Sequence, residues 1–216
     1  MPDSPVQYRE TIRRSATGSG RFIRQTATAK LFAMCDLRIE PLPRGEGFLF
    51  ENRLTLGHLP ESYFEAVREG VTEGITHGIL AGYPIIDIKV DLVNGAYHET
   101  DSTEAAFFAA AKLALQEAVT KSNPVLLEPI LRIVVHVPES SVGDLVSDLE
   151  ARKGVILDLQ SGPICIVEAK LPEGQSSGFE GQWASVAAMV RSRFAHYAEV
   201  EPPPEDGGEP IGARVS

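Results

Sequence analysis

The sequence of 216 residues predicts an α+β fold in two domains. Several segments alternate apolar and polar residues, which is the period of half-buried strands. Two longer segments between them have helical spacing or a high alanine content. After residue 126 the order of elements becomes strand, helix, strand, strand, helix, strand, which is the order of a ferredoxin-like domain.

The first domain begins with extended structure over 21–42 and a second strand over 45–54, after a Gly-containing turn. A helix is expected over 59–80, because Tyr63, Val67, Val71 and Ile75 recur at a spacing of four. Pro60 and Gly78 or Gly82 suit the two ends of such a helix.

Residues 85–93 alternate, which predicts a strand with Ile86, Ile88, Val90 and Leu92 on one face and Asp87, Lys89 and Asp91 on the other. Asn94 and Gly95 predict a turn. An Ala-rich helix over 102–121 follows, with Asp101 or Ser102 as its N-cap and Glu104 at the capping-box position.

In the second domain the expected elements are strands over 130–137, 154–161, 163–171 and 192–200, with helices over 140–153 and within 178–191. The predicted domains are therefore 1–126 and 127–200. The final stretch, 201–216, is acidic and rich in proline, and we expect it to be disordered.

Composition limits the class of protein. No apolar run reaches the ~18–20 residues of a membrane span, and the N-terminus lacks the apolar core of a signal peptide, so the cytoplasm is the expected location. The net charge is −10, yet residues 1–30 carry six cations against two acids. A local basic face could therefore still meet RNA within a Debye length of ~8–10 Å.

Motifs of common chemistry are missing from the sequence. There is no phosphate-binding G-x-x-x-x-G-K-[ST] loop, no G-x-S-x-G nucleophile elbow and no clustered histidine pair. Cys35 and Cys165 are too few and too isolated for a disulfide framework or a thiolate metal site. We expect no cofactor, no metal and no nucleotide hydrolysis.

One polar loop draws attention. Tyr97, His98 and Glu99 lie between a predicted strand and a predicted helix, where functional side chains are often displayed. His98 there is either a solvated turn residue or a contact residue. A metal or acid-base group with Glu99 and Asp101 is the third interpretation, although a short polar loop before a capped helix explains the same residues.

Five segments resemble the last two domains of bacterial elongation factor G, the ribosomal translocase: YRETIRRS, RFIRQ, GILAGYPIIDIKVDLVNGAYHETDSTEAAF, PVLLEPIL and GDLVSDLEARKGVI. The resemblance extends to about Val200. It implies a first domain, domain IV, with a fold like the second domain of ribosomal protein S5. The second, domain V, would be ferredoxin-like, and the family's GTPase domain would lie upstream of Met1.

The resemblance also implies a role for the loop. In that family the matching loop enters the decoding site of the small subunit, so it would contact ribosomal RNA and tRNA. The residues expected at this tip are His98, Tyr97, Asn94, Lys30 and Thr28. An imidazole can donate and accept hydrogen bonds and stack on a base, which suits such a contact.

Two segments depart from the family pattern. Residues 26–34, TATAKLFAM, stand where the family has a Gly-rich loop with an arginine, and only Lys30 is cationic there. Residues 176–190, SSGFEGQWASVAAMV, also lack the family's arginines, and Trp183 is either core or partner surface. Glycine permits close approach of the backbone to RNA, and arginine binds a phosphate through two parallel hydrogen bonds. The loss of these residues argues against RNA affinity.

Three functions stay open. The first is a ribosome-binding module of translocation that lacks a GTPase domain and any catalytic activity, with a separate GTPase as a candidate partner. The second is a protein interaction module that kept the fold and lost RNA binding, which the lost arginines and the acidic charge favour. The third is an enzyme on an S5-like fold, but such kinases need a phosphate loop that this sequence lacks.

Overall fold

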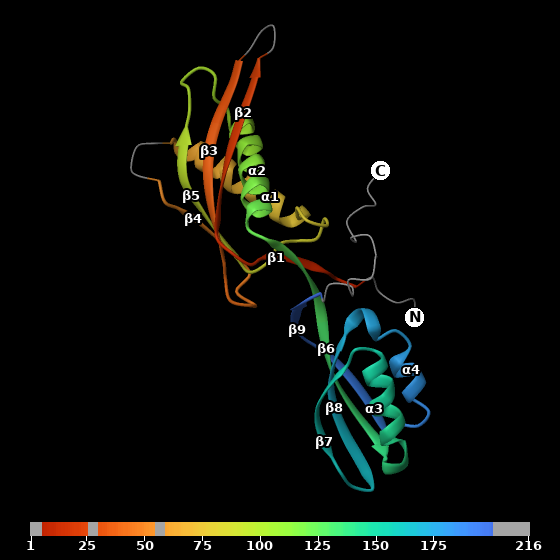
Figure 1. Cartoon of the computed structure of the whole chain (residues 1–216). Coiled ribbons are helices and arrows are strands. Elements are labelled where there is room, and N and C mark those ends of the chain that lie inside the picture. The colour runs from red at the N-terminus through yellow and green to blue at the C-terminus, as the bar shows by residue number, and fades with distance from the viewer. Residues whose placement is uncertain (1–5, 26–29, 55–58, 201–216) are drawn as a thin grey trace. The chain divides into compact units, whose positions relative to one another are not determined.

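The computed structural model describes residues 6–25, 30–54 and 59–200, in two compact units (Figure 1). One comprises residues 9–126, and the other residues 127–200 with residues 6–8. We call them the first and second domains. The expected tip residue Thr28 and the expected disordered tail, 201–216, lie outside the described residues.

The first domain is a four-stranded sheet covered by helices. Its strand order is β2-β3-β5-β4, with β4 and β5 parallel and the other pairs antiparallel. The elements are β1 (Arg9–Ile12), β2 (Ala16–Gln25), β3 (Lys30–Pro41), β4 (Phe48–Asn52), α1 (Glu61–His77), β5 (Ile88–Ala96) and α2 (Glu104–Lys121). The extended structure expected over 21–42 is thus two paired strands, and residues 30–34 of the expected tip loop belong to β3.

Two glycines let α2 pack unusually close to β2. A Cβ added at Gly20 would lie 1.8 Å from the backbone oxygen of Ala110, and one at Gly18 would lie 2.1 Å from that of Ala114. Only glycine fits there, and only small side chains fit on the facing helix. The Gly-x-Gly of β2 and the alanines of α2 therefore share one cause, which is this close approach.

The strand before the His98 loop differs from its prediction at both ends. Asp87 has a φ of 58°, so the alternation breaks and β5 begins at Ile88. Asp87 is buried, where its carboxylate accepts hydrogen bonds of 3.0 Å from the amides of Gly45 and Gly47. Asp91 is buried as well, so two of the three residues on the predicted polar face of this strand are not exposed. The predicted Asn94–Gly95 turn was also wrong, because β5 continues through both residues to pair with β3.

The N-terminus of α2 is capped one residue later than predicted. Thr103 is the N-cap, and its side chain accepts a hydrogen bond from the amide of Ala106. Ser102 is not the cap, because its hydroxyl donates to the carbonyl oxygen of Phe32 at 2.6 Å. The prediction missed this because the partner on β3 is 70 residues away in the chain.

A buried acid fixes the start of the first domain to the loop after α1. Glu10 on β1 is fully buried, and its carboxylate accepts four backbone hydrogen bonds at 2.7–3.0 Å. The donors are the amides of Ile79, Leu80, Ala81 and Tyr83. Bonds to a carboxylate are stronger than bonds between neutral groups, so this side chain holds the whole loop.

The second domain confirms the ferredoxin-like prediction. β6 lies between β9 and β8, β7 follows β8, and every pair is antiparallel. The elements are β6 (Pro124–Pro138), a 3-10 turn at Glu139–Ser141, α3 (Val142–Ala151), β7 (Val155–Gln160), β8 (Ile164–Pro172), a second 3-10 turn at Glu173–Gln175, α4 (Phe179–Trp183) and β9 (Met189–Glu199).

The last helix is shorter than its predicted segment. α4 (Phe179–Trp183) lies within the predicted segment, and β9 begins at Met189, three residues before the predicted start of the last strand. Trp183 belongs to the core, with 5% of its surface exposed, and its indole N–H donates to Asp148 at 2.8 Å. Arg152 donates to the same carboxylate at 2.9 Å. Of the two interpretations of Trp183, core is therefore the observed one.

Candidate nucleic-acid interface

The loop that contains His98 lies at one end of the first domain. β5 ends at Ala96, the loop occupies residues 97–103, and α2 follows. The ends of β2 and β3 that face each other at Gln25 and Lys30 lie at the same end of the sheet (Figure 1). We call this end, made of Gln25, Lys30 and residues 97–103, the tip.

Hydrogen bonds to β3 and within the loop hold its shape. The amide of Phe32 donates to the carbonyl oxygen of Asp101 at 2.8 Å, and the hydroxyl of Ser102 donates to the carbonyl oxygen of Phe32. The amide of His98 donates to the same Ser102 hydroxyl at 2.9 Å. Both ends of the loop are therefore anchored, and the residues between are displayed from a fixed frame.

His98 is exposed in the loop, with 61% of its side chain accessible. Its Nδ1 lies 3.1 Å from the hydroxyl of Thr100 and 3.7 Å from a carboxylate oxygen of Asp101. These neighbours engage only one ring nitrogen. Nε2 and the ring faces therefore remain able to bond to or stack on a partner.

Tyr97 adds a supported aromatic ring beside His98. It is 42% exposed, and its ring centroid lies 5.9 Å from that of Tyr63 on α1. Tyr63 in turn stacks on the buried ring of Phe107 at 4.7 Å. This row of rings fixes the position of Tyr97, and its open part can take a base by stacking.

The other expected site residues, Lys30 and Asn94, lie outside the loop that contains His98. Lys30 is the exposed first residue of β3, at the tip but on the neighbouring strand. Asn94 lies within β5 rather than in the loop, and its amide donates to a carboxylate oxygen of Asp36 at 2.9 Å. The structure therefore joins Tyr97 and His98 in one loop and puts Lys30 at the same end, while Asn94 is held on the sheet.

Two arginines near the tip were not among the expected site residues. Arg21 and Arg24 lie exposed on β2, opposite Met34 and Leu31 of β3. Neither forms a recorded ion pair within the described part of the chain. The sequence signal that could have identified them was the excess of cations over acids within residues 1–30. In the fold, part of that excess lies on β2. Lys30 pairs with Gln25 and so shares a face of the strands with Arg21, whereas Arg24 points to the other face. The three cations therefore flank this end on both faces, where they could meet phosphates.

Acids also lie near the tip. Glu99 is exposed in the loop, Asp101 lies beside His98, and Asp36 bonds to Asn94. Within the described ranges, no group of three or more metal-ligating side chains is placed to hold a metal ion. In the same ranges, no helix is long and apolar enough to cross a membrane. The tip therefore carries charges of both signs.

Comparisons with known proteins assign the chain to a family. Residues 4–123 match the family model "Elongation factor G, domain IV", and residues 125–207 match "Elongation factor G C-terminus". The chain belongs to the elongation factor G family. It is 40% identical to elongation factor G of Aquifex pyrophilus over 98% of its own length. A crystal structure from Thermus thermophilus superposes with a TM-score of 0.81, at 39% identity over 93% of this chain.

The chain matches only part of an elongation factor G. The chain spans 30% of the length of the Aquifex pyrophilus protein and 30% of the Thermus thermophilus chain. The two matching family models are both C-terminal domains of elongation factor G, and neither is its GTPase domain. The resemblance drawn from the sequence is thus confirmed, as is the α+β fold of both domains.

Proposed function

We propose that the chain is a ribosome-binding module of translocation that has no catalytic activity of its own. The tip of the first domain would contact RNA in the decoding region of the small subunit, where ribosomal RNA and tRNA meet. The observation that carries the proposal is the displayed pair of Tyr97 and His98 in a chain of the elongation factor G family. GTP hydrolysis would come from a separate GTPase partner.

The geometry supports a contact role for His98 rather than a catalytic one. Its described neighbours at the loop are a hydroxyl and a carboxylate, and it lies on an open surface. A catalytic imidazole that activates a hydroxyl is oriented by a third group at its other ring nitrogen and stands beside a site that holds the substrate, whereas Thr100 and Asp101 both approach Nδ1 of His98. A base or a ribose of RNA needs only an exposed donor, acceptor or ring face.

A ribosome pelleting assay over a series of salt concentrations tests the proposal. Binding through phosphates should weaken steeply as salt rises, because each neutralised phosphate releases a counterion. Arg21, Arg24 and Lys30 are the cations placed to make these contacts, so changing all three to Ala should flatten the salt dependence. A chain that does not pellet with ribosomes at low salt would refute the proposal.

A second function, a protein interaction module without RNA affinity, is favoured by a specific observation. Asp36, Glu99 and Asp101 surround the tip residues, and acids next to an RNA contact repel phosphates. The loss of glycines and arginine from 26–34 points the same way. Binding to ribosomes that does not respond to salt, or no binding at all, would shift the assignment to this function.

A further inference from the structure

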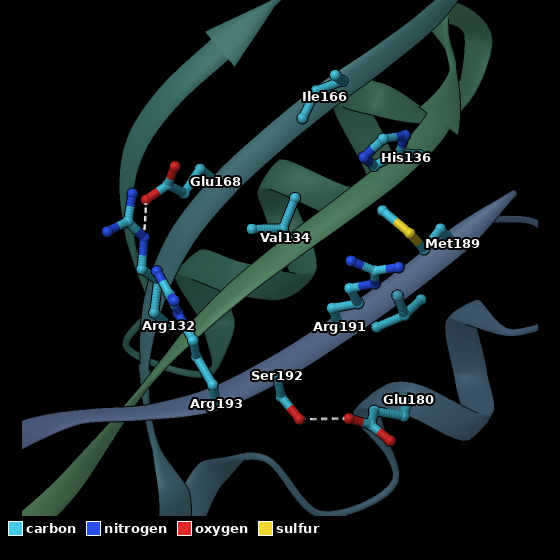
Figure 2. Close-up of a pocket in the computed structure, with 11 residues that line it drawn as sticks. Arg132, Val134, His136, Ile166, Glu168, Glu180, Met189, Arg191, Ser192 and Arg193 are labelled. Atoms are coloured by element: carbon cyan, nitrogen blue, oxygen red, sulfur yellow. Dashed lines mark hydrogen bonds and ion pairs between the residues drawn. The ribbon is translucent and has the colours of Figure 1, made fainter.

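The second domain has a hollow on the sheet face opposite its helices. α3, α4 and alternate residues of the strands form the core on one face, including Ile133 and Val135 of β6. The residues between them, Arg132, Val134 and His136, therefore point to the other face. There they line a hollow of about 810 Å³ together with Ile166 and Glu168 of β8 and with β9 (Figure 2).

Two arginines of β9 add cationic groups to this face. Arg191 and Arg193 are both exposed and lie opposite Val134 and Arg132 of β6. No hydrogen bond or ion pair is recorded for either within the described residues. Arg132, in contrast, is already paired with Glu168, and Figure 2 shows this pair beside the side chain of Arg193.

The surrounding charge makes this face stand out from the rest of the molecule. The whole chain carries −10, yet the face adds Lys170 on β8 to the three arginines. Glu168, Asp158 and Glu180 are its acids, so the four cations exceed the acids by one. Positive charge concentrated on one face of a protein with a negative net charge attracts acidic partners to that face and orients them.

The floor of the hollow is apolar. Val134 lies between Glu168 and Arg191, Ile166 and Met189 flank His136, and all three apolar side chains are only partly buried (Figure 2). Apolar surface gains about 25 cal/mol per Å² when a partner covers it, which a sugar-phosphate backbone does poorly. The described residues that line the hollow include no Phe, Tyr or Trp, and the imidazole of His136 is the one ring there on which a base could stack, whereas proteins that bind single strands stack successive bases on several aromatic side chains.

These observations favour a protein ligand over RNA. A guanidinium group binds a carboxylate through two parallel hydrogen bonds, and the apolar floor suits aliphatic side chains placed between carboxylates. We propose that this face binds an acidic segment of a partner protein, in which aliphatic residues alternate with Asp or Glu, through Arg191 and Arg193. The proposal does not depend on ribosome binding by the tip.

Fluorescence anisotropy with labelled probes tests this proposal on the full chain. The probe is a synthetic peptide of alternating Glu and Leu residues, compared with the same peptide carrying Gln for Glu and with an oligouridine of similar length. The variant is Arg191→Glu with Arg193→Glu. Its matched control is Arg68→Glu with Lys112→Glu, two exposed cations on α1 and α2 outside both sites, which changes the net charge equally on the first domain.

The acidic peptide should bind, and more weakly at about 200 mM than at about 50 mM salt. The β9 double variant should lose about tenfold or more in affinity, and the control double variant on α1 and α2 should lose less than about twofold. Ile166→Ser should weaken binding without changing its salt dependence, because it removes only apolar contact.

Several results would overturn the proposal. If both double variants lost the same affinity for the acidic peptide, the change in net charge alone would explain the effect. Tighter binding of oligouridine than of the acidic peptide, lost in the β9 variant, would make the face a nucleic-acid surface. Self-association of the chain in sedimentation velocity, abolished by the β9 variant, would identify the occupant as a second copy. Failure of the acidic peptide to bind at low salt would also reject it.

Discussion

The buried carboxylate of Glu10 allows a sharp test of how the first domain is held together. Each of its two oxygens accepts two backbone amides, from Ile79 and Leu80 on one side and from Ala81 and Tyr83 on the other. In Glu10→Gln, one oxygen becomes an NH₂ group. Two buried amide donors would then face a donor, with no acceptor in their place.

The expected cost follows from those two amides. A hydrogen bond to a charged group contributes about 1.5–3 kcal/mol, and an unsatisfied buried donor costs about 1–3 kcal/mol. Glu10→Gln should therefore lower the free energy of unfolding of the first domain by about 3–5 kcal/mol. The matched control is Glu69→Gln, an exposed acid on α1, which should change it by less than about 0.5 kcal/mol.

Urea denaturation separates the two domains by probe. The only tryptophan, Trp183, lies in the core of the second domain, whereas far-UV circular dichroism reports both domains. Glu10→Gln should shift the dichroism transition to lower urea, while the fluorescence transition keeps its midpoint. A dichroism midpoint within error of the Glu69→Gln control would refute the role assigned to the carboxylate.

Three further predictions concern packing and titration. Gly20→Ala should destabilise the first domain by about 3 kcal/mol or more, because α2 must move, whereas Gly143→Ala, with open space around it, should be neutral within about 1 kcal/mol in the same urea assay. Burial, and then the charge of Asp36, raises the pKa of Cys35 to about 12, so a thiol reagent at neutral pH should label it only after unfolding. Burial raises the pKa of Asp148, but bonds from Trp183 and Arg152 outweigh it and the pKa is lowered. Stability from that group is present above its unfolded pKa and should be lost as pH falls through the folded one, and the tryptophan transition of Asp148→Asn should lack this component.

The sequence predicted the features that depend on neighbouring residues. The alternation of β6 and β8 and the serines before α3 are local signals, and they suffice for the element order of the second domain. The position of His98 in a loop between β5 and α2 was predicted for the same reason. These elements differ from their expected ranges mainly at the ends.

The errors arose where a distant partner decides. Asp87 is buried because the amides of Gly45 and Gly47, about 40 residues earlier, supply its hydrogen bonds. The last strand begins at Met189 rather than at the predicted residue 192, because β6 pairs with it there, and the amide of Ala188 donates to the carbonyl oxygen of His136 at 2.7 Å. Propensity is a weak prior that tertiary pairing overrides.

The candidate site likewise has one part that the sequence predicted and another that it could not predict. Tyr97 and His98 are adjacent in sequence, so their shared display could be predicted. The support of Tyr97 by Tyr63, and the arrival of Arg21 and Arg24 near the tip, depend on pairing between strands and helices that no local pattern reveals. A hollow such as that on the second domain needs three strands in register, and it could not be predicted either.

The affinity of the chain for ribosomes, measured with and without the side chain of His98, tests the central claim most directly. His98→Ala should weaken binding about three- to tenfold, the loss of one exposed hydrogen bond or stack, while unfolding stability changes by less than about 0.5 kcal/mol. His77→Ala, an exposed histidine on α1, is the control and should leave affinity unchanged. Equal affinities for His98→Ala, His77→Ala and the unaltered chain would contradict the claim that the tip contacts RNA.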